Sequence, residues 1–172
     1  GEMFLMRWRL RVDAVHPWVD PGIAVFSDDL WVVGFVFGYD YVSGMVEPNV
    51  TSPFVPGEFH TYELWSKDMR AYEFCMDGVH VRSGAFRPNM AGPPARFWWG
   101  DMTQGGAGLA RWDLVEFGIV PELIVGDTNC DGVVGFGDIN PFVLRLGDLA
   151  SYHARYPLCS ALSADINEDG KV

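Results

Sequence analysis

Apolar and polar residues alternate at the start of the chain. The even positions of residues 4–12 are all large and apolar, whereas Arg7, Arg9 and Arg11 stand between them. A period of two is typical of an antiparallel strand with one buried face and one solvated face. We therefore expect a strand here, with the three arginines forming a solvated row.

Further runs of this kind follow as far as residue 120. Ser27-Asp28-Asp29 and Asp77-Gly78 are turn sequences, and the second is typical of a tight hairpin. No segment before residue 121 repeats with the helical period of about 3.6 residues. Short strands joined by turns predict an all-β fold, either a sandwich or a jelly roll. The expected strands are residues 4–12, 23–26, 30–37, 59–65, 72–76, 79–81, 96–99 and 109–120.

Composition narrows the possible partners. The chain has 172 residues, of which 49% are hydrophobic, so it can bury a sizeable core. Its formal net charge of −11 argues against nucleic acid and anionic membrane surfaces, because both need clustered basic residues. No apolar stretch reaches the roughly 18 residues of a membrane-spanning helix, so we expect no membrane insertion. Basic proteins, metal cations and neutral ligands remain as partners.

The two ends of the chain differ in composition. All seven tryptophans and ten of the twelve phenylalanines precede residue 121, whereas residues 121–172 carry eight acidic and three basic side chains. We therefore expect two domains. The first is a β-sandwich over residues 1–120, and the second is a module over residues 126–172, with residues 121–125 as the linker.

Three segments of the first domain resemble concanavalin A-like (laminin G-like) jelly rolls. They are Glu58–Leu64, Tyr72–Val79 and Trp112–Gly118, in which a histidine-containing strand precedes a hairpin with an Asp-Gly turn. The resemblance implies a jelly-roll sandwich. Because that superfamily includes lectins, carbohydrate-binding modules, glycosidases and adhesive spacers, the fold does not select a function.

We expect no catalytic site in this domain. Retaining glycosidases need two carboxylates about 5 Å apart. Asp113 and Glu116 are expected on opposite faces of a strand, because they are three residues apart. The four histidines are dispersed and match no metalloprotease motif. His60, which shares a strand face with Tyr62 and Leu64, is expected to be a buried histidine with satisfied hydrogen bonds.

Aromatic residues offer an alternative function for this domain. Trp98 and Trp99 point to opposite faces of an expected strand, so we expect at least one to be exposed and available to stack on a sugar ring. The competing interpretation is a tryptophan-rich core. Asn49 begins an Asn-Val-Thr triplet, the acceptor pattern for N-glycosylation. The other aromatic residues near turns that would shape a binding groove are Trp18, Trp31, Tyr39 and Tyr41.

Oxygen-bearing residues recur at alternate positions from residue 127 onward. Asp127, Asn129 and Asp131 occupy positions 1, 3 and 5 of a twelve-residue loop, and Asp138 closes it at position 12. Calcium takes roughly six to eight oxygen ligands, and this spacing wraps them around one ion. The sequence therefore predicts an EF-hand-type Ca²⁺ site, and the alternative is an acidic turn without a metal. The remaining ligands would be the backbone carbonyl of Val133 and a water at position 9.

Two helices are expected after this loop. The first ends at Gly147, and the second covers residues 149–156 and stops before Pro157. Four apolar residues recur with helical spacing in the first helix, which therefore has one apolar face. They are Ile139, Phe142, Val143 and Leu146.

The loop pattern then repeats. Asp165, Asn167 and Asp169 repeat positions 1, 3 and 5, 38 residues after the first loop. Such a pair of half-EF-hands, over residues 126–172, resembles the dockerin repeat. The resemblance implies a secreted bacterial protein that binds two Ca²⁺ ions and docks through its helices onto a cohesin domain of another polypeptide. It also implies that the second ion is held by Asp165, Asn167, Asp169 and the carbonyl of Lys171.

Two features depart from the dockerin pattern. Phe136 and Gly137 stand at loop positions 10 and 11, where dockerins commonly carry small hydroxyl residues. The expected partner is therefore a cohesin-like protein or another copy of this chain. The sequence ends at Val172, before positions 9 and 12 of the second loop, so we expect either a fragment of a longer chain or a loop completed by another molecule.

The cysteines bear on the compartment. Cys130 lies at loop position 4, which points away from the ion, and Cys159 shortly precedes the second repeat. Because paired calcium loops pack side by side, we expect a Cys130–Cys159 disulfide and hence an extracellular or cell-surface protein. Cys75 lies in a strand among aromatic residues and is expected to be a buried thiol.

These features together predict a mainly β protein, in which a concanavalin A-like jelly-roll sandwich is joined to a small α-helical EF-hand or dockerin-like module. The expected function is that of a non-catalytic extracellular binding and assembly protein, which docks its sandwich to a protein partner in a calcium-dependent manner. Two alternatives remain open. One is a lectin-like carbohydrate-binding module, and the other is a self-assembling extracellular structural or filament subunit.

Overall fold

The computed structural model of the chain describes residues 1–14, 22–38, 42–44, 55, 57–90, 92, 94–100 and 109–172. The strands are β1 (Glu2–Ala14), β2 (Gly22–Ser27), β3 (Trp31–Phe37), β4 (Val42–Gly44), β5 (Phe59–Ser66), β6 (Ala71–Met76), β7 (Val79–Ala85), β8 (Arg87–Pro88), β9 (Arg96–Gly100) and β10 (Leu109–Pro121). The helices are α1 (Ile139–Gly147) and α2 (Leu149–Arg155), with 3-10 turns at Phe136–Asp138 and Ala161–Ala164. No helix among the described residues has the length and apolar character that a membrane crossing requires.

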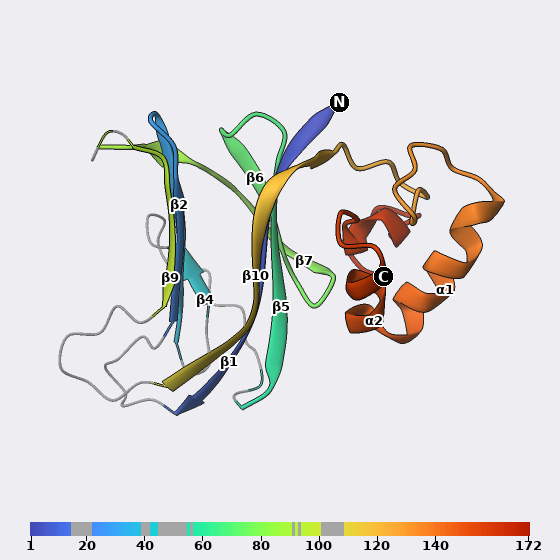
Figure 1. Cartoon of the computed structure of the whole chain (residues 1–172), viewed down its shortest axis with the longest axis horizontal. Helices are drawn as coiled ribbons and strands as arrows, with labels where there is room; N and C mark the ends of the chain where they lie inside the picture. The colour runs from blue at the N-terminus through green and yellow to red at the C-terminus, as the bar shows by residue number, and fades with distance from the viewer. Residues whose placement is uncertain are drawn as a thin grey trace.

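The strands form two antiparallel sheets that face each other. Sheet A has the order β10-β1-β5-β6-β7, and sheet B has the order β4-β3-β2-β9, with β8 pairing with β3. Figure 1 shows sheet B on the left, sheet A in the centre and the helices on the right, so the chain is arranged in three layers. The mainly β two-sheet sandwich expected from the sequence is confirmed, with a short C-terminal helical segment beside it.

The core between the sheets consists of the apolar residues that the alternation placed on one face of β1. Trp8 is fully buried at its centre, with the rings of Phe35, Phe37, Tyr62 and Phe74 at centroid distances of 5.9 to 6.1 Å. Aromatic pairs at such distances contribute about 0.5–1.5 kcal/mol each beyond the area that they bury. The even positions of β1 therefore hold sheet A against sheet B.

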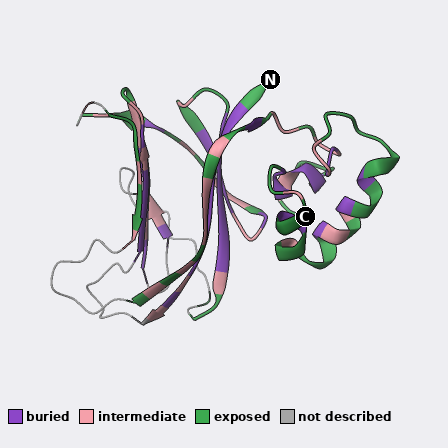
Figure 2. Cartoon of the chain, viewed as in Figure 1, coloured by how far each residue is buried: buried purple, intermediate pink, exposed green. Residues whose placement is uncertain are grey.

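The outer face of sheet A is buried as well. Seven of the eight residues of β5 are buried, whichever way their side chains point. Arg7 on β1 has 0% of its surface exposed and Glu63 on β5 has 1%. Figure 2 shows the buried colour along β5 where the helical layer lies against it. The residues that cover this face belong to 126–172, which we call the C-terminal unit.

The expectation of a solvated arginine row is therefore wrong for Arg7. Arg9 and Arg11 remain partly exposed, because they lie further along β1. The alternation correctly placed the three arginines on one face of the strand. It carries no information about a layer that packs on that face from the other end of the chain.

The connection between the sandwich and the C-terminal unit is itself packed. β10 ends at Pro121, and Leu123 packs on a small cluster that includes Met3 and Trp65 on the outer face of sheet A. The backbone N–H of Leu123 donates to the sulfur of Met3 at 3.2 Å. The connection therefore lies against sheet A before the first acidic loop begins.

Candidate functional site

The first acidic loop is organised by hydrogen bonds from backbone N–H groups to its aspartates. Asp127 Oδ1 accepts from the N–H of Asp131 at 3.1 Å, and Asp127 Oδ2 accepts from the N–H of Gly132 at 2.8 Å. Asp138 closes the loop, because its Oδ1 accepts from Asn129 at 3.0 Å and its Oδ2 accepts from Gly135 at 2.8 Å. The side chains at positions 1 and 12 thus face the same loop interior.

The second loop repeats this geometry with its own residues. Asp165 Oδ1 accepts from the N–H of Asp169 at 3.1 Å, and Asp165 Oδ2 accepts from the N–H of Gly170 at 2.7 Å. The amide of Asn167 donates to Asp169 Oδ2 at 3.0 Å, as the amide of Asn129 donates to Asp131 Oδ2 at 3.0 Å. The two segments therefore fold alike through position 6, as their sequences predict.

Backbone conformation matches in the two loops as well. Position 4 has a positive φ in both, 57° at Cys130 and 55° at Glu168. Position 6 is glycine in both, with φ of 88° at Gly132 and 83° at Gly170. Glycine adopts this left-handed region without the cost that a side chain brings. A side chain at position 6 would therefore strain the turn that brings positions 1 and 5 together.

The chemistry of these side chains fits a hard cation. A carboxylate has about four acceptor sites, and Asp127 uses two of them for backbone N–H groups, so acceptor sites remain. Burial alone raises the pKa of Asp138, but the N–H groups of Gly135 and Asn129 outweigh burial and hold its pKa below the usual range. Its carboxylate is therefore charged and oriented.

These loops differ from a closed metal centre made of acidic, cysteine and histidine side chains. Among the residues that the structure describes, no three His, Cys, Asp or Glu side chains gather into such a centre. The ligand set that the sequence predicts for each loop instead combines aspartate with asparagine and the carbonyl at position 7, Val133 in the first loop and Lys171 in the second. Mixed sets of this kind suit Ca²⁺ better than transition metals.

The expected disulfide joins Cys130 to Cys159, with 5.7 Å between their Cα atoms. It links position 4 of the first loop to the segment that precedes the second loop. Tyr152 of α2 strengthens this link, because its hydroxyl donates to the carbonyl of Thr128 at 2.9 Å. Cys75 is a buried free cysteine, as expected.

The apolar face of α1 is exposed, which the sequence did not lead us to expect. Ile139 is 54% exposed, Val143 60% and Leu146 56%, whereas Arg145 is only 5% exposed. The helix is amphipathic with the predicted spacing, but it turns its arginine toward sheet A. Its apolar stripe consequently faces away from the rest of the chain.

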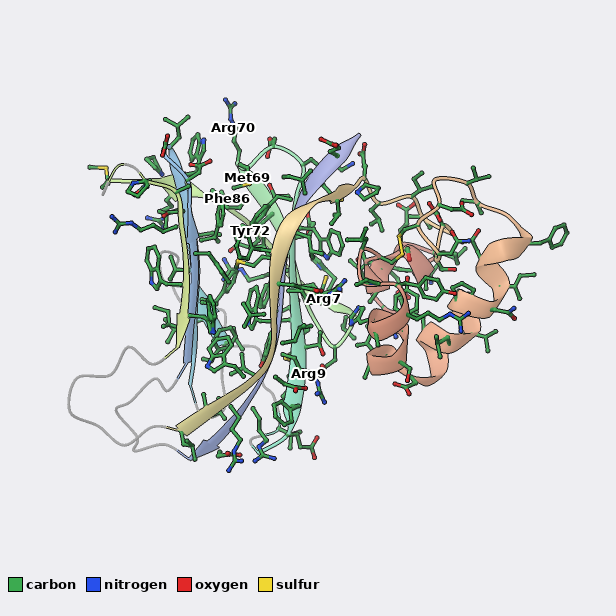
Figure 3. The ribbon with its side chains drawn as sticks, viewed as in Figure 1. Arg7, Arg9, Met69, Arg70, Tyr72 and Phe86 are labelled. Carbon is green, nitrogen blue, oxygen red and sulfur yellow. A yellow bond between two sulfur atoms is a disulfide. The ribbon has the colours of Figure 1, made fainter. Side chains whose placement is uncertain are left out.

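Arg7 is the centre of the contact between sheet A and the C-terminal unit. Its guanidinium donates to Glu63 at 2.8 Å and to Glu116 at 2.6 Å, both in sheet A. It also donates to the backbone carbonyls of Pro157 at 2.8 Å and Cys159 at 2.6 Å in the C-terminal unit. Figure 3 shows Arg7 on the side of sheet A that faces the helices. One buried side chain thus joins two strands to two carbonyls of the C-terminal unit.

Asp113 and Glu116 lie on one face of β10, so the expectation that they point to opposite faces is wrong. The pairing of β1 with β10 shifts register between Arg9 and Leu10, which leaves Asp113 as an extra residue in β10. Such a bulge reverses the alternation beyond it. Asp113 pairs with Arg9 and Glu116 pairs with Arg7, so neither carboxylate is available as an acid or a base.

A cleft of about 330 Å³ opens where α2 meets sheet A. Its ionisable lining residues are Arg9, Asp113, Glu116 and His153. His153 is 8% exposed, and its Nε2 lies 3.4 Å from Glu63 Oε1. Arg9 pairs with Asp113 and Arg7 with Glu116 at this cleft, whereas Nε2 of His153 has no hydrogen-bond partner among the described residues.

A serine, a histidine and a glutamate also meet on β6 and β7, but their geometry does not activate the serine. Glu73 Oε2 accepts from Ser83 Oγ at 2.6 Å and lies 2.7 Å from His80 Nε2. A catalytic triad needs the acid and the serine on different ring nitrogens. Here Glu73 and Ser83 both lie near Nε2 of His80. The serine hydroxyl therefore donates to the carboxylate instead of to the imidazole.

The remaining candidates are one histidine and the aromatic and glycosylation candidates of the sandwich. His60 is 8% exposed, its Nδ1 lies 2.6 Å from Asp77 Oδ2 and its Nε2 lies 3.2 Å from the Val55 carbonyl. This confirms the expected satisfied histidine. Trp98 and Trp99 are both exposed, at 42% and 49%. The candidates that lie outside the described residues are Trp18, Tyr39, Tyr41 and the glycosylation candidate Asn49.

No family model matches the chain, and no curated protein matches it. Among solved structures, sheep galectin-11 in complex with glycerol is 13% identical with a TM-score of 0.43, and the match covers 67% of this chain and 89% of that one. The botulinum neurotoxin serotype C1 binding domain is 12% identical with a TM-score of 0.41, covering 69% and 32%. The carbohydrate binding module CBM66 from Bacillus subtilis is 12% identical with a TM-score of 0.36, covering 68% and 75%.

These are distant likenesses, and the two-sheet architecture rests on the strand order of this chain itself. The ligand of this chain has to be argued from its own side chains.

The buried carboxylate of Glu63 predicts acid sensitivity. Burial raises its pKa, but the charges of Arg7 and His153 outweigh burial and lower it to about 2. Because the folded pKa lies below the unfolded value of about 4.3, the stabilisation is present above that value and is lost as pH falls through the folded pKa. We expect the free energy of unfolding to drop by about 3 kcal/mol between pH 5 and pH 2 from this group.

Denaturant unfolding measured across that pH range checks this. The free energy of unfolding of Glu63→Gln should be lower than that of the wild type at pH 6, and it should vary less with pH. Glu58→Gln, at an exposed position in the bend just before β5, should follow the wild type. Equal pH slopes for the wild type and Glu63→Gln would contradict the assignment.

Proposed function

We propose that this chain is a non-catalytic extracellular binding protein whose C-terminal unit holds Ca²⁺. The observation that carries the proposal is the repetition of one hydrogen-bonded loop geometry at residues 127–138 and 165–172. A calcium ion in each loop would offset the negative charge of its aspartates.

The first loop would hold its ion through the side chains of Asp127, Asn129, Asp131 and Asp138 and the carbonyl of Val133. The second would use Asp165, Asn167, Asp169 and the carbonyl of Lys171. An extracellular location is supported by the disulfide, because such bonds persist in oxidising compartments. Calcium concentrations outside cells also suit modest loops of this type.

Calcium titration calorimetry on the chain tests this proposal. We expect one ion for each loop. Because the ion binds only the folded state, it should raise the free energy of unfolding by about 2.7 kcal/mol at a hundredfold excess over the dissociation constant. The melting temperature should therefore rise with calcium. Asp127→Asn should remove the ion of the first loop. Asp29→Asn, in an exposed turn of the sandwich, is the matched control and should bind as the wild type does. A melting temperature that is the same in calcium and in EDTA would refute the proposal.

Carbohydrate is the ligand class that we propose for the sandwich. Trp98 and Trp99 are half exposed on β9, which lies at an edge of sheet B. Phe97 stacks on Trp99 at 5.3 Å and meets Phe117 of β10 at 4.7 Å, so the aromatic cluster continues from one sheet to the other. Exposed aromatic rings present an apolar face that can stack on a sugar.

A glycan array followed by affinity measurement tests the carbohydrate proposal. Trp99→Ala should weaken binding of any glycan found by at least about tenfold, or 1.4 kcal/mol. Phe136→Ala is the control, because Phe136 is an aromatic residue exposed at 94% on the C-terminal unit. Retained binding by Trp99→Ala, or an array without hits, would count against this ligand class.

Protein docking through α1 is the second candidate function. Its exposed stripe continues toward the first loop through Phe136, and apolar surfaces of this kind mark contact sites. The partner would be a cohesin-like protein or a second copy of the chain.

Sedimentation velocity in calcium distinguishes these two partners. Concentration-dependent association that is abolished by Val143→Glu, but not by Leu30→Glu on the sandwich, supports a second copy. A monomer at every concentration excludes self-association through this face.

A further inference from the structure

Besides the approach of His153 to Glu63, three sets of hydrogen bonds join the C-terminal unit to the sheet A side among the described residues. Arg7 holds the carbonyls of Pro157 and Cys159. Arg145 of α1 donates to the carbonyl of Gly78, in the turn between β6 and β7, at 3.4 Å. The N–H of His80 on β7 donates to the carbonyl of Gly170 at 2.6 Å. We call the sheet A side of these contacts the docking face.

Two of these contacts are directly connected to an acidic loop. Gly170 donates its N–H to the carboxylate of Asp165 and accepts from His80 at its carbonyl, so one residue connects a candidate ligand to β7. Cys159, whose carbonyl Arg7 holds, is bonded through sulfur to Cys130 of the first loop. The docking face therefore constrains both loops.

The fit at the docking face is close. Gly78 has a φ of 74°, and a Cβ atom there would lie 1.9 Å from the guanidinium of Arg145. A Cβ atom on Gly170 would lie 3.0 Å from that of His80. A side chain at either position would crowd the group across the contact, so both contacts depend on glycine.

We propose that the docking face is the binding surface for the calcium-loaded form of the chain's own C-terminal unit, with Arg7 as the positioning residue. The proposal rests on the calcium function proposed above. If the ion orders a loop and the ordered loop docks, then docking and calcium binding are linked, and each strengthens the other by the same factor. Removal of calcium would release the β6–β7 turn, and loss of Arg7 would weaken the calcium site.

Hydrogen exchange on the unmodified chain tests one direction of this linkage. The amide of His80 should exchange at least about tenfold faster in EDTA than in calcium, because its acceptor Gly170 is released. Amides of β2, which lies inside sheet B and contacts neither loop, should keep their exchange rates. This measurement needs no variant, so misfolding of a mutant cannot obscure it.

Calcium titration of two arginine variants tests the other direction. Arg7→Met should weaken calcium binding by at least about tenfold. Arg9→Met is the matched control, because Arg9 lies two residues along the same strand face and pairs with Asp113 instead of with the C-terminal unit. Arg9→Met should bind calcium within about twofold of the wild type.

The outcomes separate the two proposals. Faster exchange at His80 in EDTA, together with weaker binding by Arg7→Met alone, supports the linkage. If the wild type binds calcium but His80 exchange is unchanged and the two variants bind equally, the linkage is overturned and the calcium function stands. If the wild type binds no calcium, the calcium function fails and the linkage fails with it.

Discussion

The arrangement of the chain depends on the burial of the Arg7 guanidinium between sheet A and the C-terminal unit. Removal of a charge from water costs several kcal/mol, and that cost is recovered only when counter-charges and acceptors surround the charge. Arg7 has two carboxylates from its own sheet and two carbonyls from the C-terminal unit. Without the second pair, the arginine would stand in water, and the outer face of β5 would be exposed with it.

This constraint explains why the chain has three layers. A two-sheet sandwich needs only one apolar face on each sheet, and the even positions of β1 supply it. The residues of β5 are buried on both sides because the third layer covers their outer side chains. The same contact turns Arg145 inward and leaves the apolar stripe of α1 exposed. The outward face of α1 is therefore apolar and exposed because the opposite face of the same helix contacts the docking face.

Local patterns in the sequence were sufficient to predict the longer strands, both loops, the helices and the Cys130–Cys159 disulfide, but not the short strands β4 and β8. Each depends on spacing between nearby residues or on a repeat that is visible in the chain. The burial of Arg7 and the exposure of Val143 could not be predicted. The first depends on contacts between segments about 150 residues apart, and the second on the contact of Arg145 with Gly78, 67 residues away. The shared face of Asp113 and Glu116 was missed because a bulge leaves no mark in the hydrophobic pattern.

The account gives the acidic loops two roles, as cation sites and as the parts of the C-terminal unit that sheet A holds in place. A crystal structure of the chain grown in calcium, with the ions located by their anomalous scattering, tests this most directly. The account predicts an ion at the Asp127 loop, an ion at the Asp165 loop, and Arg7 buried against the carbonyls of Pro157 and Cys159. Ion-free loops, or a C-terminal unit that has left sheet A with Arg7 in solvent, would contradict it.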